Sequence, residues 1–166
     1  HVHAELTDDM VRKAEEKLGV TLPKLLIEML RQQHGGIVRK SYSITFEGFF
    51  GLSDDEMKPN MVHAHQWKTW RDAKEKAKTA GRVPSPEDFE LLVPIAGDEC
   101  HFYYCLDYRT HGPQAEPRVT YIDVECQNDS ELAISLTAFV QQFRSEVDEC
   151  TTSVTRETVQ AGLACW

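Results

Sequence analysis

Two short segments near the start of the chain each carry the pattern of an amphipathic helix. In the first, apolar residues recur at helical spacing between Thr7, an N-cap residue, and Gly19. In the second, they recur between Pro23, which suits the first helical position, and the pair Gly35-Gly36. Two such helices joined by a short turn predict a helical hairpin whose apolar stripes must cover another apolar surface.

Strand-like segments supply that surface. Residues 41–52, SYSITFEGFFGL, alternate apolar and polar side chains with the period of two of a half-buried strand. LLVPIA, residues 91–96, is a short apolar strand whose proline suits a sheet edge or a bulge. Residues 100–108 and 119–125 alternate as well and predict two paired strands. The even positions expected to face the core are Tyr42, Ile44, Phe46, Phe50 and Leu52 in the first segment, and Cys100, Phe102, Tyr104, Leu106 and Tyr108 in the third.

Two more helices complete the order of elements. Residues 60–79 place Trp67, Trp70, Ala73 and Ala77 on one stripe. After a turn at residues 128–130, the segment LAISLTAFVQQFRSEV predicts a final helix with a stripe of Leu132, Leu136, Phe139, Val140 and Phe143.

The resulting order, α-α-β-α-β-β-β-α, predicts an α+β fold. We expect a mostly antiparallel sheet of about four to six strands packed by helices, with an N-terminal α-hairpin and a C-terminal helix. One domain is expected over residues 1–166, with a core at about residues 6–147. Residues 148–166 form an extension, either a frayed tail or a further helix.

Charge is distributed unevenly along the chain, whose net charge is −9. Residues 1–85 hold 14 basic and 12 acidic residues, whereas residues 86–166 hold 4 basic and 15 acidic residues, a net of −11. A surface of this kind repels nucleic acid, whose binders need basic patches. It attracts a basic protein partner and raises its association rate, although acidity also serves plain solubility.

Location follows from what the sequence lacks. No apolar run approaches the ~20 residues of a membrane span, and no basic-then-apolar leader is visible. The five cysteines include no Cys-x-x-Cys pair, which favours reduced thiols. We therefore expect a cytoplasmic protein without membrane contact.

Candidate metal and phosphate sites fail on geometry. His63 and His65 point about 200° apart on a helix, so they cannot share a metal ion. Cys100 and Cys105 have opposite parity on a strand and face opposite sides of the sheet. No glycine pattern matches a phosphate-binding loop. We expect no metal and no cofactor.

A cysteine hydrolase would need Cys105, His101 and Asp107, which share one face of a strand. Residues two apart on a strand are about 6–7 Å apart, beyond the hydrogen-bond reach of about 2.6–3.2 Å that a nucleophile and its base require. The strand tyrosines Tyr103, Tyr104 and Tyr108 could stack on RNA bases, but the acidity of this half favours a packing role. We expect no catalytic residues.

Four motifs follow one another along the chain: EEKLGVTLPKLLIEMLRQQHGG, FEGFFGLSD, LLVPIAGDECHFYYCLDY and SLTAFVQQF. In this order they resemble the SUKH superfamily, which includes yeast cell-wall synthesis regulators of the Smi/Knr kind and many bacterial proteins. EEKLGVTLPKLLIEMLRQQHGG resembles the family's opening, with its Leu-Gly, Leu-Pro and Gly-Gly pairs. FEGFFGLSD resembles its strand into an acidic turn, LLVPIAGDECHFYYCLDY its middle strand pair and SLTAFVQQF its last helix. Glu99-Cys100 departs from the double glycine often found in the middle hairpin, and residues 60–79 read as an insertion.

This resemblance implies a non-enzymatic α+β protein. Bacterial members are typically immunity proteins that bind and neutralise toxin domains, often nucleases, and a basic nuclease cleft suits an acidic binder. We therefore expect a protein partner, a basic toxin domain. A regulator of the Smi/Knr kind and a small cysteine hydrolase stay open as alternatives. Charge alone selects the residues expected to contact the partner: Asp54, Asp55, Glu56, Asp107, Asp123 and Glu125.

Overall fold

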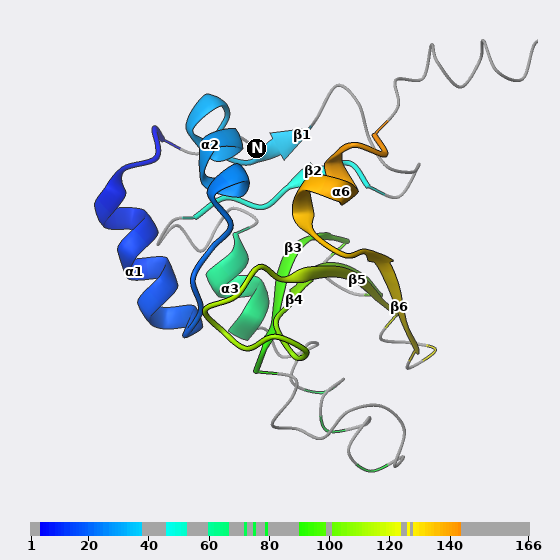
Figure 1. The fold of residues 1–166 in the computed structure, drawn as a ribbon. Helices are drawn as coiled ribbons and strands as arrows, with labels where there is room; N and C mark the ends of the chain where they lie inside the picture. Colours follow the sequence, from blue (N-terminus) through cyan, green and yellow to red (C-terminus); the bar gives the residue numbers. More distant parts are fainter. Residues whose placement is uncertain are drawn as a thin grey trace, which may run out of the picture.

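The chain folds into a four-stranded antiparallel sheet with helices on its flanks, as the computed structural model in Figure 1 shows. The structure describes residues 4–37, 46–52, 60–66, 90–98, 101–123 and 128–143, with single residues 72, 75, 79 and 126. The α+β prediction is confirmed. The elements are α1 (Asp8–Leu18), α2 (Lys24–Gln32), β1 (Gly36–Ile37), β2 (Gly48–Phe49), α3 (Met61–Gln66), β3 (Leu92–Gly97), β4 (Phe102–Asp107), β5 (Arg118–Asp123), β6 (Asn128–Ala133) and α6 (Leu136–Val140).

The helical hairpin forms where the sequence predicts it. The Thr7 hydroxyl accepts a hydrogen bond from the Met10 N–H, and Gly19 ends α1 in the left-handed conformation, at φ 72°. Pro23 lies one residue before α2, as its N-cap, rather than in the first helical position. The helix also ends at Gln32, before the two glycines, where the C-cap residue Gln33 is already extended, and Gly36 belongs to β1.

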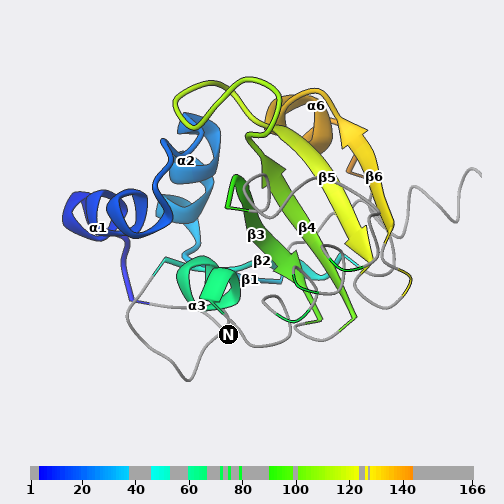
Figure 2. The same ribbon diagram turned by 90° about the horizontal axis from the view of Figure 1, so that it is seen from below.

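The sheet has the simplest topology, with each strand beside its neighbour in sequence. Figure 2 shows β3, β4, β5 and β6 side by side in that order, with α1, α2 and α3 beyond the β3 edge and α6 against β5 and β6. The register of β3 on β4 shifts between Pro94 and Ala96. The predicted edge strand with a proline bulge is therefore confirmed.

Strand β4 is covered on both of its faces. Tyr103 and Cys105 point to one side and Tyr104 and Leu106 to the other, and all four are buried. The prediction of a half-buried strand was wrong here, because the residues at odd positions are apolar enough to pack as well. On the second side, the Tyr104 ring lies 4.9 Å from that of Phe46, measured between centroids.

Residues 128–133 form strand β6, which corrects the prediction of a turn followed by a helix. Asp129 pairs with Ile122 of β5 and Ala133 pairs with Val119, with one irregularity between. The final helix therefore begins only at Leu136, where the Ser135 hydroxyl accepts a hydrogen bond from the Ala138 N–H. The apolar residues of β6 and α6 follow one another at helical spacing, and the sequence therefore predicts a single helix.

The segment predicted as a strand over 41–52 is described from Phe46 onward, and only two of its residues form strand β2. Phe46, Phe50 and Leu52 are buried as predicted, but Phe49 is buried too, so the alternation does not continue. The backbone of β2 lies so close to β1 that a Cβ on Gly48 would be 1.9 Å from the Gly36 carbonyl oxygen. The Phe50 N–H donates to the Ile95 carbonyl at 2.7 Å and joins this ladder to β3.

His34 ties three separate segments together in the interior. It is 3% exposed, and its Nδ1 lies 2.5 Å from the Ala4 carbonyl oxygen. Its Nε2 accepts the Leu52 backbone N–H at 2.8 Å. The two partners fix the tautomer, since a carbonyl requires a donor and an N–H requires an acceptor. The side chain thus joins the chain before α1, the end of α2 and the segment after β2.

The predicted helix over 60–79 is described as α3 and as helical residues at 72, 75 and 79. The tryptophan and alanine stripe, Trp67, Trp70, Ala73 and Ala77, lies outside the described residues, as does the extension 148–166. None of the helices in the described part of the chain is both long and apolar enough to cross a membrane.

Candidate functional site

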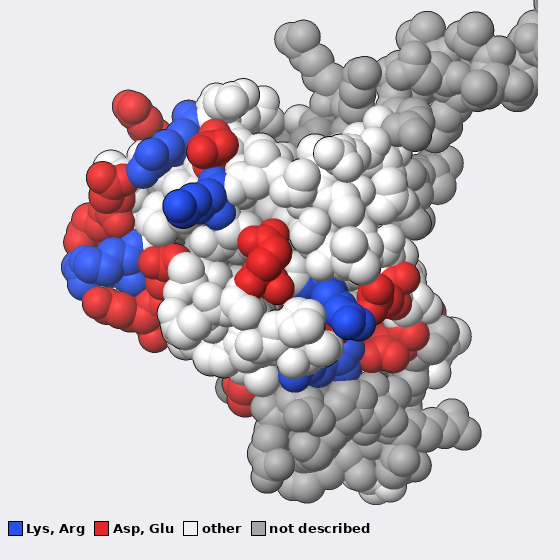
Figure 3. All heavy atoms as spheres, in the orientation of Figure 1, with Lys and Arg blue, Asp and Glu red and all other residues white. Residues whose placement is uncertain are grey.

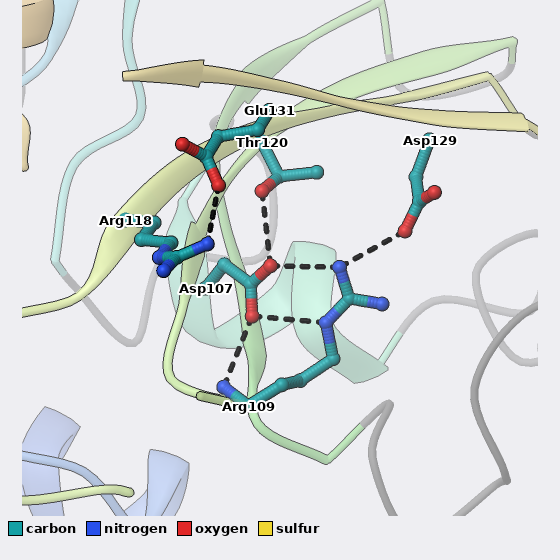
Figure 4. Close-up of polar contacts among 6 residues, drawn as sticks. All are labelled: Asp107, Arg109, Arg118, Thr120, Asp129 and Glu131. Atoms are coloured by element: carbon teal, nitrogen blue, oxygen red, sulfur yellow. Dashed lines mark hydrogen bonds and ion pairs between the residues drawn. The ribbon is translucent and has the colours of Figure 1, made fainter. Parts of the chain in front are cut away.

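Six polar side chains meet on one face of the sheet, at the end of β4. Asp107 pairs with Arg118 across β4 and β5, and Thr120 pairs with Glu131 across β5 and β6. Paired residues of antiparallel strands share a face, and so do residues two apart on one strand. We call the resulting group the sheet cluster (Figure 4): Asp107, Arg109, Arg118, Thr120, Asp129 and Glu131.

The buried end of the sheet cluster is a bidentate ion pair. Arg109 donates from Nε to Asp107 Oδ1 at 2.9 Å and from Nη2 to Oδ2 at 2.7 Å. The Arg109 backbone N–H adds a bond to Oδ1 at 3.0 Å, and the Thr120 hydroxyl donates to Oδ2 at 2.9 Å. Both oxygens of this buried carboxylate are therefore fully hydrogen-bonded, as burial of a charge requires.

These contacts keep both partners charged. Burial acts to raise the pKa of Asp107, but the hydrogen bonds and charge of Arg109, with the Thr120 hydroxyl, outweigh it and hold the pKa below its usual value. For Arg109, burial acts to lower the pKa, and the contacts with Asp107 and Asp129 raise it instead.

Two further ion pairs of the sheet cluster lie nearer to solvent. Arg109 Nη2 also donates to Asp129 Oδ2 at 2.9 Å, and Arg118 Nη1 donates to Glu131 Oε2 at 2.5 Å. Side-chain exposure rises from 16% at Arg109 to 29% at Asp129 and 44% at Glu131. The six side chains, with Thr110, line a hollow of about 400 Å³. In Figure 3 a group of mixed charge lies over β5 and β6, apart from the charges on α1.

The sheet cluster consists of ion-paired and hydrogen-bonded side chains. It holds three carboxylates and two guanidinium groups, and it offers neither a thiol nor an imidazole as a nucleophile or base. Within the described ranges, no group of three or more His, Cys, Asp or Glu side chains could hold a metal ion.

The structure brings together few of the residues predicted to contact a partner. Asp107 belongs to the sheet cluster, but at its buried end. Asp123 lies at the far end of β5 on the opposite face, where it accepts the Cys126 N–H at 2.8 Å. Asp54, Asp55, Glu56 and Glu125 lie outside the described residues. The partner-binding role of all six stays a prediction.

Five members of the sheet cluster were not foreseen: Arg109, Arg118, Thr120, Asp129 and Glu131. Their signal is charge of opposite sign on neighbouring strands, Arg118 on β5 and Glu131 on β6. That signal can be read only after residues 128–133 are recognised as a strand.

The residues considered for a cysteine hydrolase do not assemble. Cys105 is fully buried, and burial together with the charge of Asp107 raises the pKa of its thiol. His101 is exposed, and its Nδ1 lies 2.5 Å from Asp98 Oδ2 instead of facing Asp107. A protonated, buried thiol is a poor nucleophile.

The tyrosines considered for base stacking are part of the core. Tyr103, Tyr104 and Tyr108 are at most 2% exposed. The Tyr108 hydroxyl donates to the Thr21 carbonyl at 2.7 Å, which ties the end of β4 to the helical hairpin. They present no surface on which nucleotide bases could stack.

The chain matches a known protein family. Residues 5–142 match the SMI1 / KNR4 family (SUKH-1). A search of curated proteins found no match. The match spans the helical hairpin, the whole sheet and α6, in the order that the sequence motifs predict. The chain therefore belongs to the SMI1/KNR4 family (SUKH-1), which includes immunity proteins.

Proposed function

We propose that this chain is an immunity protein that neutralises a basic toxin domain by direct binding. The observation that carries this proposal is the acidity of residues 86–166, which contain 15 acidic and 4 basic residues. Members of the family are generally non-catalytic, which agrees with binding as the mode of action.

The structure sharpens the charge argument. Arg109 and Arg118 are the two basic residues of this half within the described ranges, and both are engaged in the sheet cluster. The described acids of this half, Glu90, Asp98, Asp107, Glu116, Asp123, Asp129 and Glu131, outnumber these two arginines. A surface with this excess of acidic residues accelerates encounter with a basic domain and disfavours nucleic acid.

Strand addition is the less suitable way to bind such a partner. Edge strand β3 carries Pro94 and a bulge, and the Phe50 N–H already occupies the Ile95 carbonyl. Edge strand β6 carries Asp129, Glu131 and an irregular register. Charges, prolines and bulges are the features that keep edge strands from pairing with another chain. Contact through side chains on the sheet face fits these edges better.

Co-expression tests the proposal. The proposal predicts a toxin-like reading frame next to the gene of this chain. That frame is expressed in a host from an inducible promoter, with and without this chain. The proposal predicts that the host survives only with the chain present, and that a toxin variant without its catalytic residue is harmless in both cases. Equal killing with and without the chain, at confirmed expression of both proteins, would contradict it.

A further inference from the structure

The hollow over the sheet cluster, together with the acidity of the chain, suggests how a basic partner is recognised. We propose that this hollow receives a Lys or Arg side chain of the bound protein, which pairs with Asp129 and Glu131. This inference rests on the proposed function and names the contact surface for it.

Charge balance supports a cationic occupant. Three carboxylates surround the hollow and two guanidinium groups oppose them, which leaves one negative charge. Asp107 is saturated by its four hydrogen bonds from Arg109 and Thr120. The surplus therefore belongs to the two acids nearer solvent, and a third cation would make the group neutral.

Available oxygen atoms support the same occupant. Asp129 uses only Oδ2, toward Arg109, and Glu131 uses only Oε2, toward Arg118. The other oxygen of each has no hydrogen-bond donor among the residues that the structure describes. Carboxylate oxygens are the acceptors that ammonium and guanidinium groups prefer.

Pre-organisation makes the contact efficient. Each outer carboxylate is held by an arginine, so its side chain loses less freedom when a partner binds. The volume of about 400 Å³ falls within the range of about 300–1,000 Å³ seen for ligand sites. Its walls are charged and polar, whereas sites for apolar ligands are lined mainly by apolar side chains.

A small probe tests the hollow without the toxin. Amide chemical shifts of the isotope-labelled chain are followed during titration with ethylguanidinium chloride, an analogue of the arginine side chain. Saturable shifts are expected at the amides of Thr120, Asp129 and Glu131. Glu131→Gln should abolish the saturation, while Glu28→Gln, which removes an exposed acid on α2, should leave it intact.

Three results would overturn the cation site. Sodium chloride at equal ionic strength could cause the same shifts, or Glu131→Gln could retain them. Sodium phosphate could saturate the same amides in place of ethylguanidinium, which would make the hollow an anion site. The circular dichroism spectrum and melting temperature of each variant show whether it is folded.

Binding to the adjacent toxin domain separates the two proposals. If the wild-type chain binds, Glu131→Gln should weaken binding about two- to fivefold, the range of a partly exposed ion pair, and Glu28→Gln should not. Equal affinity of both variants would overturn the hollow as the contact and leave the proposed function standing. No binding by the wild type, with ethylguanidinium still saturating, would overturn the proposed function instead.

Discussion

Arg109 forms a bidentate ion pair with Asp107, two residues earlier in the chain. Its Nε lies 2.9 Å from one carboxylate oxygen and its Nη2 lies 2.7 Å from the other. The same Nη2 lies 2.9 Å from Asp129 of β6. A single guanidinium group thus connects the end of β4 to the edge strand across β5. Arg109 thereby holds one of the two outer acids of the sheet cluster, and Arg118 holds the other, Glu131.

Removal of the guanidinium should destabilise the fold. Arg109→Ala leaves the Asp107 charge buried without its partner, and we expect a loss of about 3 kcal/mol in the free energy of unfolding. Arg118→Gln is the control, because the Arg118 side chain is 33% exposed and its ion pair should contribute no more than about 1 kcal/mol. Urea unfolding of both variants measures the difference. Equal losses would contradict a special role for Arg109.

Acid should weaken the fold through Asp107. Its pKa is lower in the folded chain than in the unfolded chain, so its contribution is complete above the unfolded value of about 3.9. The contribution is lost as the pH falls through the lower, folded pKa. Urea unfolding from pH 6 to pH 2 should therefore show a steeper loss of stability for the wild type than for Asp107→Asn. Parallel curves would show that Asp107 is not the group responsible.

His34→Ala should loosen the joint between the hairpin and the segment after β2. The substitution leaves the Leu52 N–H without its acceptor in a buried place, which costs about 1–3 kcal/mol. His111→Ala, at an exposed position, should change the free energy of unfolding by less than about 0.5 kcal/mol. Thermal and urea unfolding compare the two, and a neutral His34→Ala would refute the linking role.

Thiol labelling should separate two cysteines. Cys105 is buried and its thiol pKa is raised, whereas Cys126 is exposed. Iodoacetamide applied to the native chain at pH 8 should therefore modify Cys126 and spare Cys105, as read by peptide mass mapping. Rapid modification of Cys105 with loss of a hydrolytic activity would revive the cysteine hydrolase.

Local signals made much of the fold predictable. Thr7 and Gly19 set the two ends of α1. The hydrogen bond of Thr7 and the dihedral angles of Gly19 depend only on near neighbours in sequence. Pro94 marks an edge strand because it lacks an N–H. Such features act over a few residues, so a single sequence displays them.

Features that depend on tertiary contacts were missed. Strand β6 is set by pairing with β5, and its residues Leu132 and Ala133 continue a helical pattern into α6. Burial of Tyr103 and Cys105 depends on what covers the second face of β4, which alternation cannot report. The sheet cluster needs the register of three strands, so charge alone selected Asp107 but not Arg109 or Glu131.

Isothermal titration of this chain with the purified, catalytically inactive domain of the toxin expected from the neighbouring gene measures toxin binding itself. We expect a one-to-one complex whose affinity falls at least about tenfold between 0.05 and 0.5 M NaCl, because salt screens the charges that attract the basic domain. Absence of a complex at low salt, or an affinity independent of salt, would contradict it.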